Sequence, residues 1–113
     1  MLEASGCAAT VDAGSVPLLP GVLDLAVADV VSGGTKRNHA WLGPTTDWGR
    51  LPAPAQLVLA DAQTSGGLLV ATRHEDALRT ALDDQGVMSV PIGDVIDGSP
   101  GRITVRGHRL AGA

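Results

Sequence analysis

Two short polar segments carry the residue types best suited to hold a phosphate group. Residues 32–38 read SGGTKRN and residues 61–67 read DAQTSGG. Paired glycines let a ligand approach the backbone closely, and hydroxyl, amide and basic side chains donate hydrogen bonds to phosphate oxygens. The candidate phosphate- or nucleotide-proximal residues are Gly33, Gly34, Thr35, Lys36, Arg37, Asn38, Thr64, Ser65, Gly66 and Gly67.

Both segments also have a purely structural interpretation. A Gly-Gly pair beside Ser or Thr is typical of a helix stop or of a turn that enters a strand. Neither segment matches the phosphate-binding loop GxxxxGK or the dinucleotide fingerprint GxGxxG. For Asp61, which precedes the second turn, we expect a capping role rather than a bound cation. Local composition leaves the two interpretations open.

The remaining reactive side chains form no catalytic or metal-binding pattern. His39, His74 and His108 are far apart in the sequence, and we expect each of them on the surface. Cys7 is the single cysteine, which excludes an internal disulfide, and we expect it to behave as a small buried hydrophobic residue. No Cys or His pair has the spacing of a structural zinc site. We therefore assign no catalytic residue and no metal ligand.

Length and composition predict one domain with an aliphatic core. A chain of 113 residues suffices for a single domain. Hydrophobic residues make up 44% and charged residues 18%, which excludes a mainly disordered chain. Because the sequence has two Trp but no Phe or Tyr, Leu, Val, Ile and Ala must fill the core.

The charge and hydropathy patterns exclude several kinds of partner. The net charge is -4 and the eight Lys and Arg residues are scattered, so no basic stripe is available to bind nucleic acid. No apolar stretch approaches the ~20 residues that a membrane span needs. The N-terminus lacks a basic region ahead of an apolar segment, so we expect a cytoplasmic protein.

Helices and strands are predicted to alternate along the first half of the chain. A helical turn at residues 1–5 ends at Gly6 and is followed by a strand at 7–11. Apolar spacing predicts an amphipathic helix that starts at Pro20 and runs to residue 30. The Ser-Gly-Gly sequence then ends this helix, and we expect residues 35–38 to form a polar loop.

The second half has a similar pattern, with an antiparallel pair of strands at its end. The predicted elements are an irregular connection at 43–54, a short helix at 56–60, a turn at 64–67, a strand at 68–72, a helix at 73–85 and strands at 87–95 and 102–105. The helix at 73–85 has a capping box at Thr72 and Glu75 and a left-handed cap at Gly86. Its predicted buried residues are Ala77, Leu78, Ala81 and Leu82.

These elements predict an α/β (α+β) fold in which helices pack on a mixed sheet. We expect residues 1–106 to form a domain and residues 107–113 to form a loose tail. A single helical turn does not nucleate alone, so we expect the natural domain to begin upstream of residue 1.

The two polar segments at this separation resemble those of the C-terminal domain of selenophosphate synthetases (selenide, water dikinases), in the aminoimidazole ribonucleotide synthetase-like superfamily. The resemblance covers about residues 1–105, and its most specific part is the string DxQTSGGLL. Ala62 departs from the family, which usually has Pro there. The matching stretches are residues 16–26, 33–38, Asp47 with Trp48, 61–69 and 92–95.

The resemblance implies an enzyme that uses ATP and Mg²⁺ to form selenophosphate from selenide, with release of AMP and phosphate. Its catalytic residues would lie upstream, in an N-terminal ATP-binding half, so this chain alone is expected to be inactive. A homodimer is a possible assembly. The alternative is a stand-alone, non-catalytic binding or interaction domain of the same fold.

In the family interpretation, the two segments lie on one side of the domain and face the missing half. Thr35, Asn38, Thr64 and Ser65 are then expected to be accessible to solvent.

Overall fold

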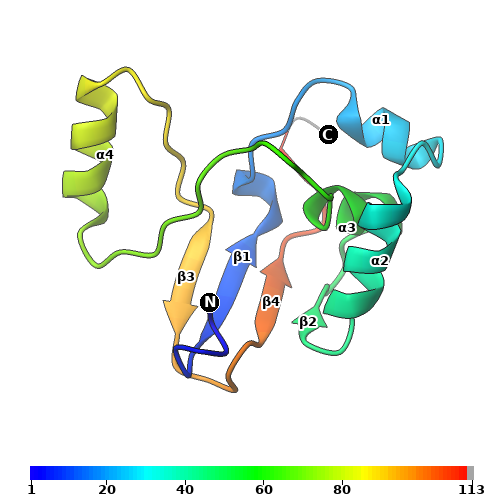
Figure 1. Cartoon of the computed structure of the whole chain (residues 1–113), viewed down its shortest axis with the longest axis horizontal. Helices are drawn as coiled ribbons and strands as arrows, with labels where there is room; N and C mark the ends of the chain where they lie inside the picture. Colours follow the sequence, from blue (N-terminus) through cyan, green and yellow to red (C-terminus); the bar gives the residue numbers. More distant parts are fainter. Residues whose placement is uncertain (112–113) are drawn as a thin grey trace.

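The computed structural model describes residues 1–111, in which a mixed sheet of four strands is accompanied by four α-helices and one 3-10 helix (Figure 1). The predicted α+β class is therefore confirmed. The strands are β1 (Ala8–Asp12), β2 (Thr46–Asp47), β3 (Gly93–Ile96) and β4 (Ile103–Arg106). The helices are η1 (Ala13–Ser15), α1 (Val22–Val27), α2 (Gly33–Leu42), α3 (Ala53–Leu59) and α4 (Glu75–Asp84).

Strand β1 lies inside the sheet, whose strand order is β2-β4-β1-β3. It pairs antiparallel with β3 and parallel with β4, and β4 pairs parallel with β2. The prediction that the last two strands pair with each other is wrong, because β1 lies between them. A Cβ atom at Gly93 would collide with the Thr10 carbonyl oxygen, so the approach of β3 to β1 requires glycine there.

The turn before β1 ends as predicted. Gly6 has a φ of 65°, its N–H donates to the Glu3 carbonyl, and the Cys7 N–H donates to the Leu2 carbonyl. This pair of hydrogen bonds is the Schellman arrangement that closes the C-terminus of a helix. The same arrangement closes α4 at Gly86, which has a φ of 69°.

The helix predicted at residues 20–30 is shorter than expected. α1 begins at Val22 after Gly21, whose φ is 80°, and it ends at Val27. The following turn places Asp29 at a φ of 58°, a conformation that interrupts the helix. β-branched residues near this end also have lower helix propensity.

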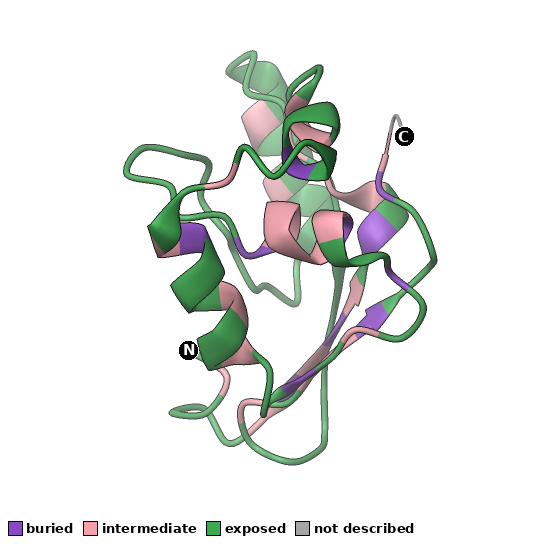
Figure 2. Ribbon diagram, turned by 90° about the vertical axis from the view of Figure 1, so that its right-hand side faces the viewer, coloured by how far each residue is buried: buried purple, intermediate pink, exposed green. Residues whose placement is uncertain are grey.

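Small aliphatic side chains form the core, as the composition predicted. Its buried residues are Ala13, Leu51, Ala55, Val105 and Leu110. Partly buried side chains that pack against them are Leu18, Leu23, Trp48, Val58, Leu59 and Ile103. Figure 2 shows that buried residues occupy only a few short parts of the ribbon.

The expected loose tail is anchored in this core. Leu110 is only 2% exposed and belongs to the core cluster, so the chain stays attached beyond β4. Residues 112 and 113 of the predicted tail lie outside the described residues.

The region around α4 departs most from the predictions. α4 contains no buried residue, so the predicted burial of its apolar face is wrong; Leu78 and Leu82 are half-buried, whereas Ala77 and Ala81 are exposed. Figure 1 shows α4 at one edge of the molecule, away from the other helices.

The segments that flank α4 also differ from the predictions. Residues 68–72 form no strand, and of the residues 87–92 that precede the short β3 only Ile92 bonds to β1, through the Asp12 N–H. A strand needs a neighbouring strand to bond its backbone groups, and β-branched composition alone does not supply one. Thr72 does not cap α4, because its hydroxyl accepts from the His74 N–H and the helix begins at Glu75.

Two shorter elements, β2 and α3, lie in the middle of the chain. α3 confirms the predicted short helix but begins at Ala53, with Pro54 in its first turn. The segment at 43–54 was predicted to be irregular, yet it contains β2. This two-residue strand is recognised as a strand only because it pairs with β4. No helix within residues 1–111 is long and apolar enough to span a bilayer.

We expect substitution of the buried Leu110 to destabilise the fold more than substitution of an exposed leucine. Leu110→Ala should lower the free energy of unfolding by about 2 to 5 kcal/mol, because it leaves a cavity in the core. Leu68→Ala is the matched control: Leu68 is 96% exposed, and the change should stay within about 0.5 kcal/mol. Urea unfolding measures both; equal losses would contradict the burial of the tail.

Candidate functional site

The first polar segment is the start of a helix and not the predicted loop. α2 begins at Gly33, and the Ser32 side chain caps it by accepting from the Thr35 N–H at 3.1 Å. A Ser-Gly-Gly sequence can end one helix and cap the next, since Ser is a favoured N-cap residue. The residues that follow include Lys, Arg, Ala and Leu, which favour helix.

The Thr35 hydroxyl joins the two polar segments. Its Oγ1 donates to Asp61 Oδ1 at 2.5 Å and accepts from the Ala62 N–H at 3.1 Å. Its third contact is with Ser32 Oγ at 3.0 Å. Because the Thr35 proton points to Asp61, the Ser32 hydroxyl must donate in that contact. The hydroxyl thus uses its donor site and both acceptor sites.

Two further contacts hold α2 along the end of α3. Asn38 Nδ2 donates to the Ala60 carbonyl oxygen at 3.2 Å. A Cβ atom at Gly34 would lie 3.1 Å from the Ala62 Cβ, so this glycine lets the two segments approach closely. The expected proximity of the two segments is confirmed for the part that ends at Ala62.

Most of the candidate side chains are accessible, with one important exception. Asn38, Thr64 and Ser65 are exposed, as predicted. Thr35 is only 1% exposed, so its predicted accessibility is wrong: its hydroxyl is consumed by the junction with Asp61. Asp61 likewise binds a side chain of α2, where a capping role in its own turn was expected.

The remaining candidates surround the junction. Gly33, Lys36 and Arg37 are exposed in the first turns of α2, and Gly34 is half-buried. Residues 64–67 form an exposed segment beyond Ala62. A role for these residues in binding phosphate or nucleotide remains a prediction.

Two basic side chains of α2 differ in their surroundings. Lys36 Nζ pairs with Asp29 Oδ1 at 2.8 Å, an exposed ion pair that stabilises the fold little. Arg37 Nη1 lies 3.5 Å from the position that a Cβ of Gly33 would occupy, so its guanidinium group covers the first turn of α2. Arg37 makes no ion pair within the described part of the chain.

A second polar network holds α2 through His39, which follows Thr35 by four residues and lies on the same face of the helix. His39 Nε2 contacts Gln56 Oε1 at 2.9 Å, and Gln56 Nε2 donates to the Leu51 carbonyl at 2.7 Å. Because the Gln56 oxygen can only accept, His39 donates from Nε2. The His39 ring stacks on Trp48 with their centroids 5.3 Å apart.

The predicted surface position of His39 is therefore wrong, whereas His74 and His108 are exposed as predicted. The spacing of Thr35 and His39 would have indicated that His39 contacts the rest of the fold. Residues four apart share a face of a helix, but that reading requires α2 to be recognised as a helix first.

We expect Thr35→Val to lower the free energy of unfolding by about 1 to 3 kcal/mol. The substitution keeps the side-chain shape but leaves Asp61 and the Ala62 N–H without their partner. Thr35→Ser, which keeps the hydroxyl, should cost less. Thr64→Val is the control at an exposed threonine and should change stability by no more than about 0.5 kcal/mol. Urea unfolding tests the series, and equal effects at positions 35 and 64 would refute the junction.

No protein-family model matches this chain. Curated proteins named selenide, water dikinase, however, match it over most of its length. The protein from Myxococcus xanthus is 42% identical over 104 residues, which are 89% of this chain. The proteins from Escherichia coli O139:H28 and Shigella flexneri are each 36% identical over 107 residues, or 93% of this chain.

The matches cover most of this chain but only a part of each relative. The chain spans about 30% of the length of each of these relatives. The matched part lies toward their C-terminal end, in agreement with the resemblance drawn from the two polar segments. The chain is thus homologous to a C-terminal portion of the selenide, water dikinases.

Proposed function

We propose that this chain acts as the C-terminal portion of an enzyme that forms selenophosphate from selenide and ATP, with release of AMP and phosphate. Within that enzyme the chain supplies scaffold and one wall of the nucleotide site. The observation that carries the proposal is the similarity to selenide, water dikinases over 89–93% of the chain. The two polar segments that carry the resemblance are also in contact, through the Thr35 hydroxyl and Asp61.

The proposed phosphate contacts come from the exposed first turn of α2. The first N–H groups of a helix have no partner within the helix, and Ser32 satisfies only that of Thr35. The N–H groups of Gly33 and Gly34 are thus available to an anion, which the helix dipole also favours. Arg37 adds a charged donor beside them.

The other components of the reaction are proposed to come from the rest of such an enzyme. ATP and Mg²⁺ would serve the complete protein, where the metal neutralises charge on the phosphates. Residues 1–111 contain no group of three His, Cys, Asp or Glu side chains that could hold a metal ion. We therefore place no metal ligand in this chain and expect no catalysis from it alone.

The proposed partner is the remaining portion of the enzyme, in the cytoplasm. Its support is an apolar surface on the segments around α4 and on β3. Large exposed apolar surfaces mark interaction sites. The exposed large apolar side chains of these segments are Leu68, Leu69, Val70, Val87, Met88, Val90, Val95 and Ile96.

The same surface favours the alternative function. A stand-alone, non-catalytic interaction domain would also present apolar side chains to a partner, and a homodimer could cover them. The two functions differ in what a complete upstream portion would add: only the first predicts that joining it to this chain produces an active enzyme.

We expect the purified chain to make no selenophosphate from selenide, ATP and Mg²⁺, because residues 1–111 hold no group of three side chains that could bind the metal. A chimaera that joins the upstream portion of the E. coli relative to this chain should make it. Phosphorus NMR detects the product, with the intact E. coli enzyme as positive control. Product formed by the isolated chain would refute the assignment of catalysis to the missing portion. A folded chimaera that binds ATP but forms no product would favour the interaction domain.

In the same chimaera, Arg37→Gln should raise the KM for ATP about tenfold or more. A charged hydrogen-bond contact contributes roughly 1.5 to 3 kcal/mol, which corresponds to at least this factor. Arg73→Gln is the matched control, because Arg73 is exposed but lies beside α4. Steady-state kinetics of both variants decide the question, and equal KM values would remove α2 from the nucleotide site.

A further inference from the structure

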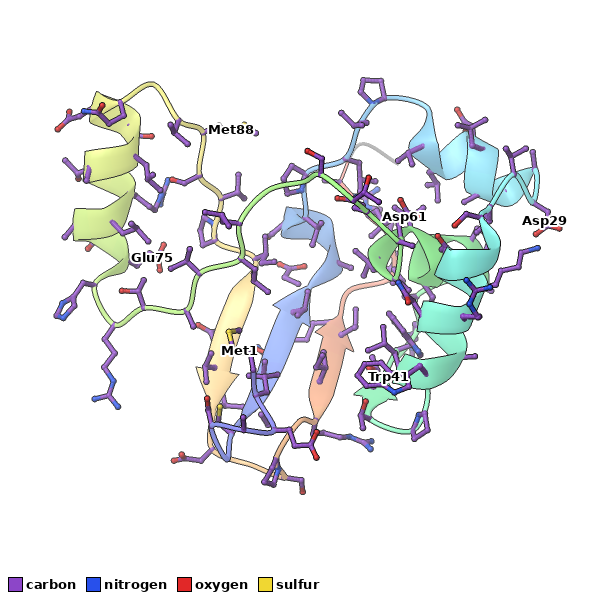
Figure 3. The ribbon with its side chains drawn as sticks, viewed as in Figure 1. Met1, Asp29, Trp41, Asp61, Glu75 and Met88 are labelled. Atoms are coloured by element: carbon purple, nitrogen blue, oxygen red, sulfur yellow. The ribbon has the colours of Figure 1, made fainter. Side chains whose placement is uncertain are left out.

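A small pocket lies between α2 and the end of α3, and the proposed phosphate contacts do not use it. Its volume is about 310 Å³, at the lower end of the range for small-molecule sites. Figure 3 labels Trp41 and Asp61, which come to it from α2 and from the segment after α3. Its lining residues are Asn38, Trp41, Leu42, Leu59, Ala60 and Asp61.

The polar side chains of the pocket present acceptors and a negative charge. Asn38 uses its amide nitrogen on the Ala60 carbonyl, so its Oδ1 remains a free acceptor. Asp61 accepts the Thr35 hydroxyl on Oδ1 and keeps Oδ2 available. No Lys or Arg pairs with Asp61 among residues 1–111. A ligand that satisfies this end must therefore donate hydrogen bonds, and a positive charge would suit it.

The other end of the pocket is apolar. Trp41 is 79% exposed, and Leu42 and Leu59 beside it are half-buried. Trp41 follows Thr35 by six residues, or about 9 Å along the axis of α2. Because Thr35 holds Asp61, the carboxylate and the indole reach the pocket from different turns of α2.

We propose that this pocket binds an organic cation on an apolar stem, such as an alkylguanidinium or alkylammonium group. The cation donates to Asp61 and Asn38, and the stem lies against Trp41 and Leu59. Charge-assisted hydrogen bonds from a guanidinium to a carboxylate are strong, and long basic side chains cover apolar surface with their stems. This site is independent of the selenophosphate function.

The electrostatics disfavour the other ligand classes. An anion would be repelled by Asp61, and a neutral apolar molecule would cover the carboxylate without satisfying it. The net charge of -4 attracts cations to the chain as a whole. The cation could be a free small molecule or a Lys or Arg side chain of another polypeptide.

Butylguanidinium and its uncharged analogue butylurea test the proposal on the whole chain. Proton–nitrogen NMR should show a saturable shift of the Trp41 indole N–H and of the Asn38 side-chain amide with butylguanidinium. Butylurea should bind about tenfold more weakly, the difference expected for one charged contact. The Trp48 indole serves as internal reference, since its ring stacks on His39. No saturable shift, or equal binding of the two compounds, would overturn the proposal.

Asp61→Asn removes the charge but keeps an oxygen that can accept from Thr35. It should weaken butylguanidinium binding about tenfold and leave butylurea unchanged. Asp84→Asn, on the last turn of α4, is the matched control and should have no effect. If Asp61→Asn unfolds the chain, the salt dependence of the native protein decides: added salt should weaken binding of butylguanidinium and not of butylurea. Binding insensitive to both charge and salt would overturn the proposal.

An acetylated and amidated Leu-Arg dipeptide separates the two sources of the cation. Tighter binding of the dipeptide than of butylguanidinium would support the proposal and assign the pocket to a side chain of a polypeptide. Equal binding would support it with a free cation as the ligand. Failure of both compounds to bind would overturn it.

Discussion

The buried hydroxyl of Thr35 is the interaction on which the arrangement of the candidate site depends. It donates to Asp61, accepts from the Ala62 N–H and contacts Ser32, so none of its hydrogen-bonding capacity remains. Burying a polar group costs free energy unless hydrogen bonds satisfy it in this way. The position of α2 relative to the end of α3, and thus of every side chain that α2 presents, follows from this contact and from the His39 network on the same helix face.

The rest of the fold divides into a packed side and an uncovered side. On the packed side, Leu51, Ala55 and Leu110 form a buried cluster with Val105 of β4. Hydrogen bonds from Asn38 and His39 attach α2 to α3 and to its C-terminal end on this side. Around α4, by contrast, no helical residue is buried, and Leu68 and Met88 face solvent. Large exposed apolar surfaces mark interaction sites. The uncovered side is therefore where the proposed partner would bury apolar side chains.

The sequence predicted features that local chemistry determines and missed those that distant contacts determine. Gly6 and Gly86 were identified as caps because a left-handed residue after a helical turn favours glycine. Ser32 was misread, since the same residue type can follow one helix and cap another. The predicted strand at 68–72 failed because its composition suits a strand but no neighbouring strand pairs with it. The insertion of β1 between β3 and β4, and the burial of Thr35 and Leu110, depend on partners far away in the sequence.

The N-terminal part of α2 has opposite electrostatic preferences on two of its faces. Gly33, Gly34 and Arg37 favour an anion at the N-terminal end, whereas Asp61 favours a cation only a short distance away. The carboxylate of Asp61 also interacts favourably with the dipole of the helix whose Thr35 it holds. A phosphate group at this helix would be repelled by Asp61, so it must approach from the side of Gly33 and Arg37 rather than from Ala62. The junction that joins the two polar segments thus also separates the proposed anion-binding face of α2 from the face proposed to accept a cation.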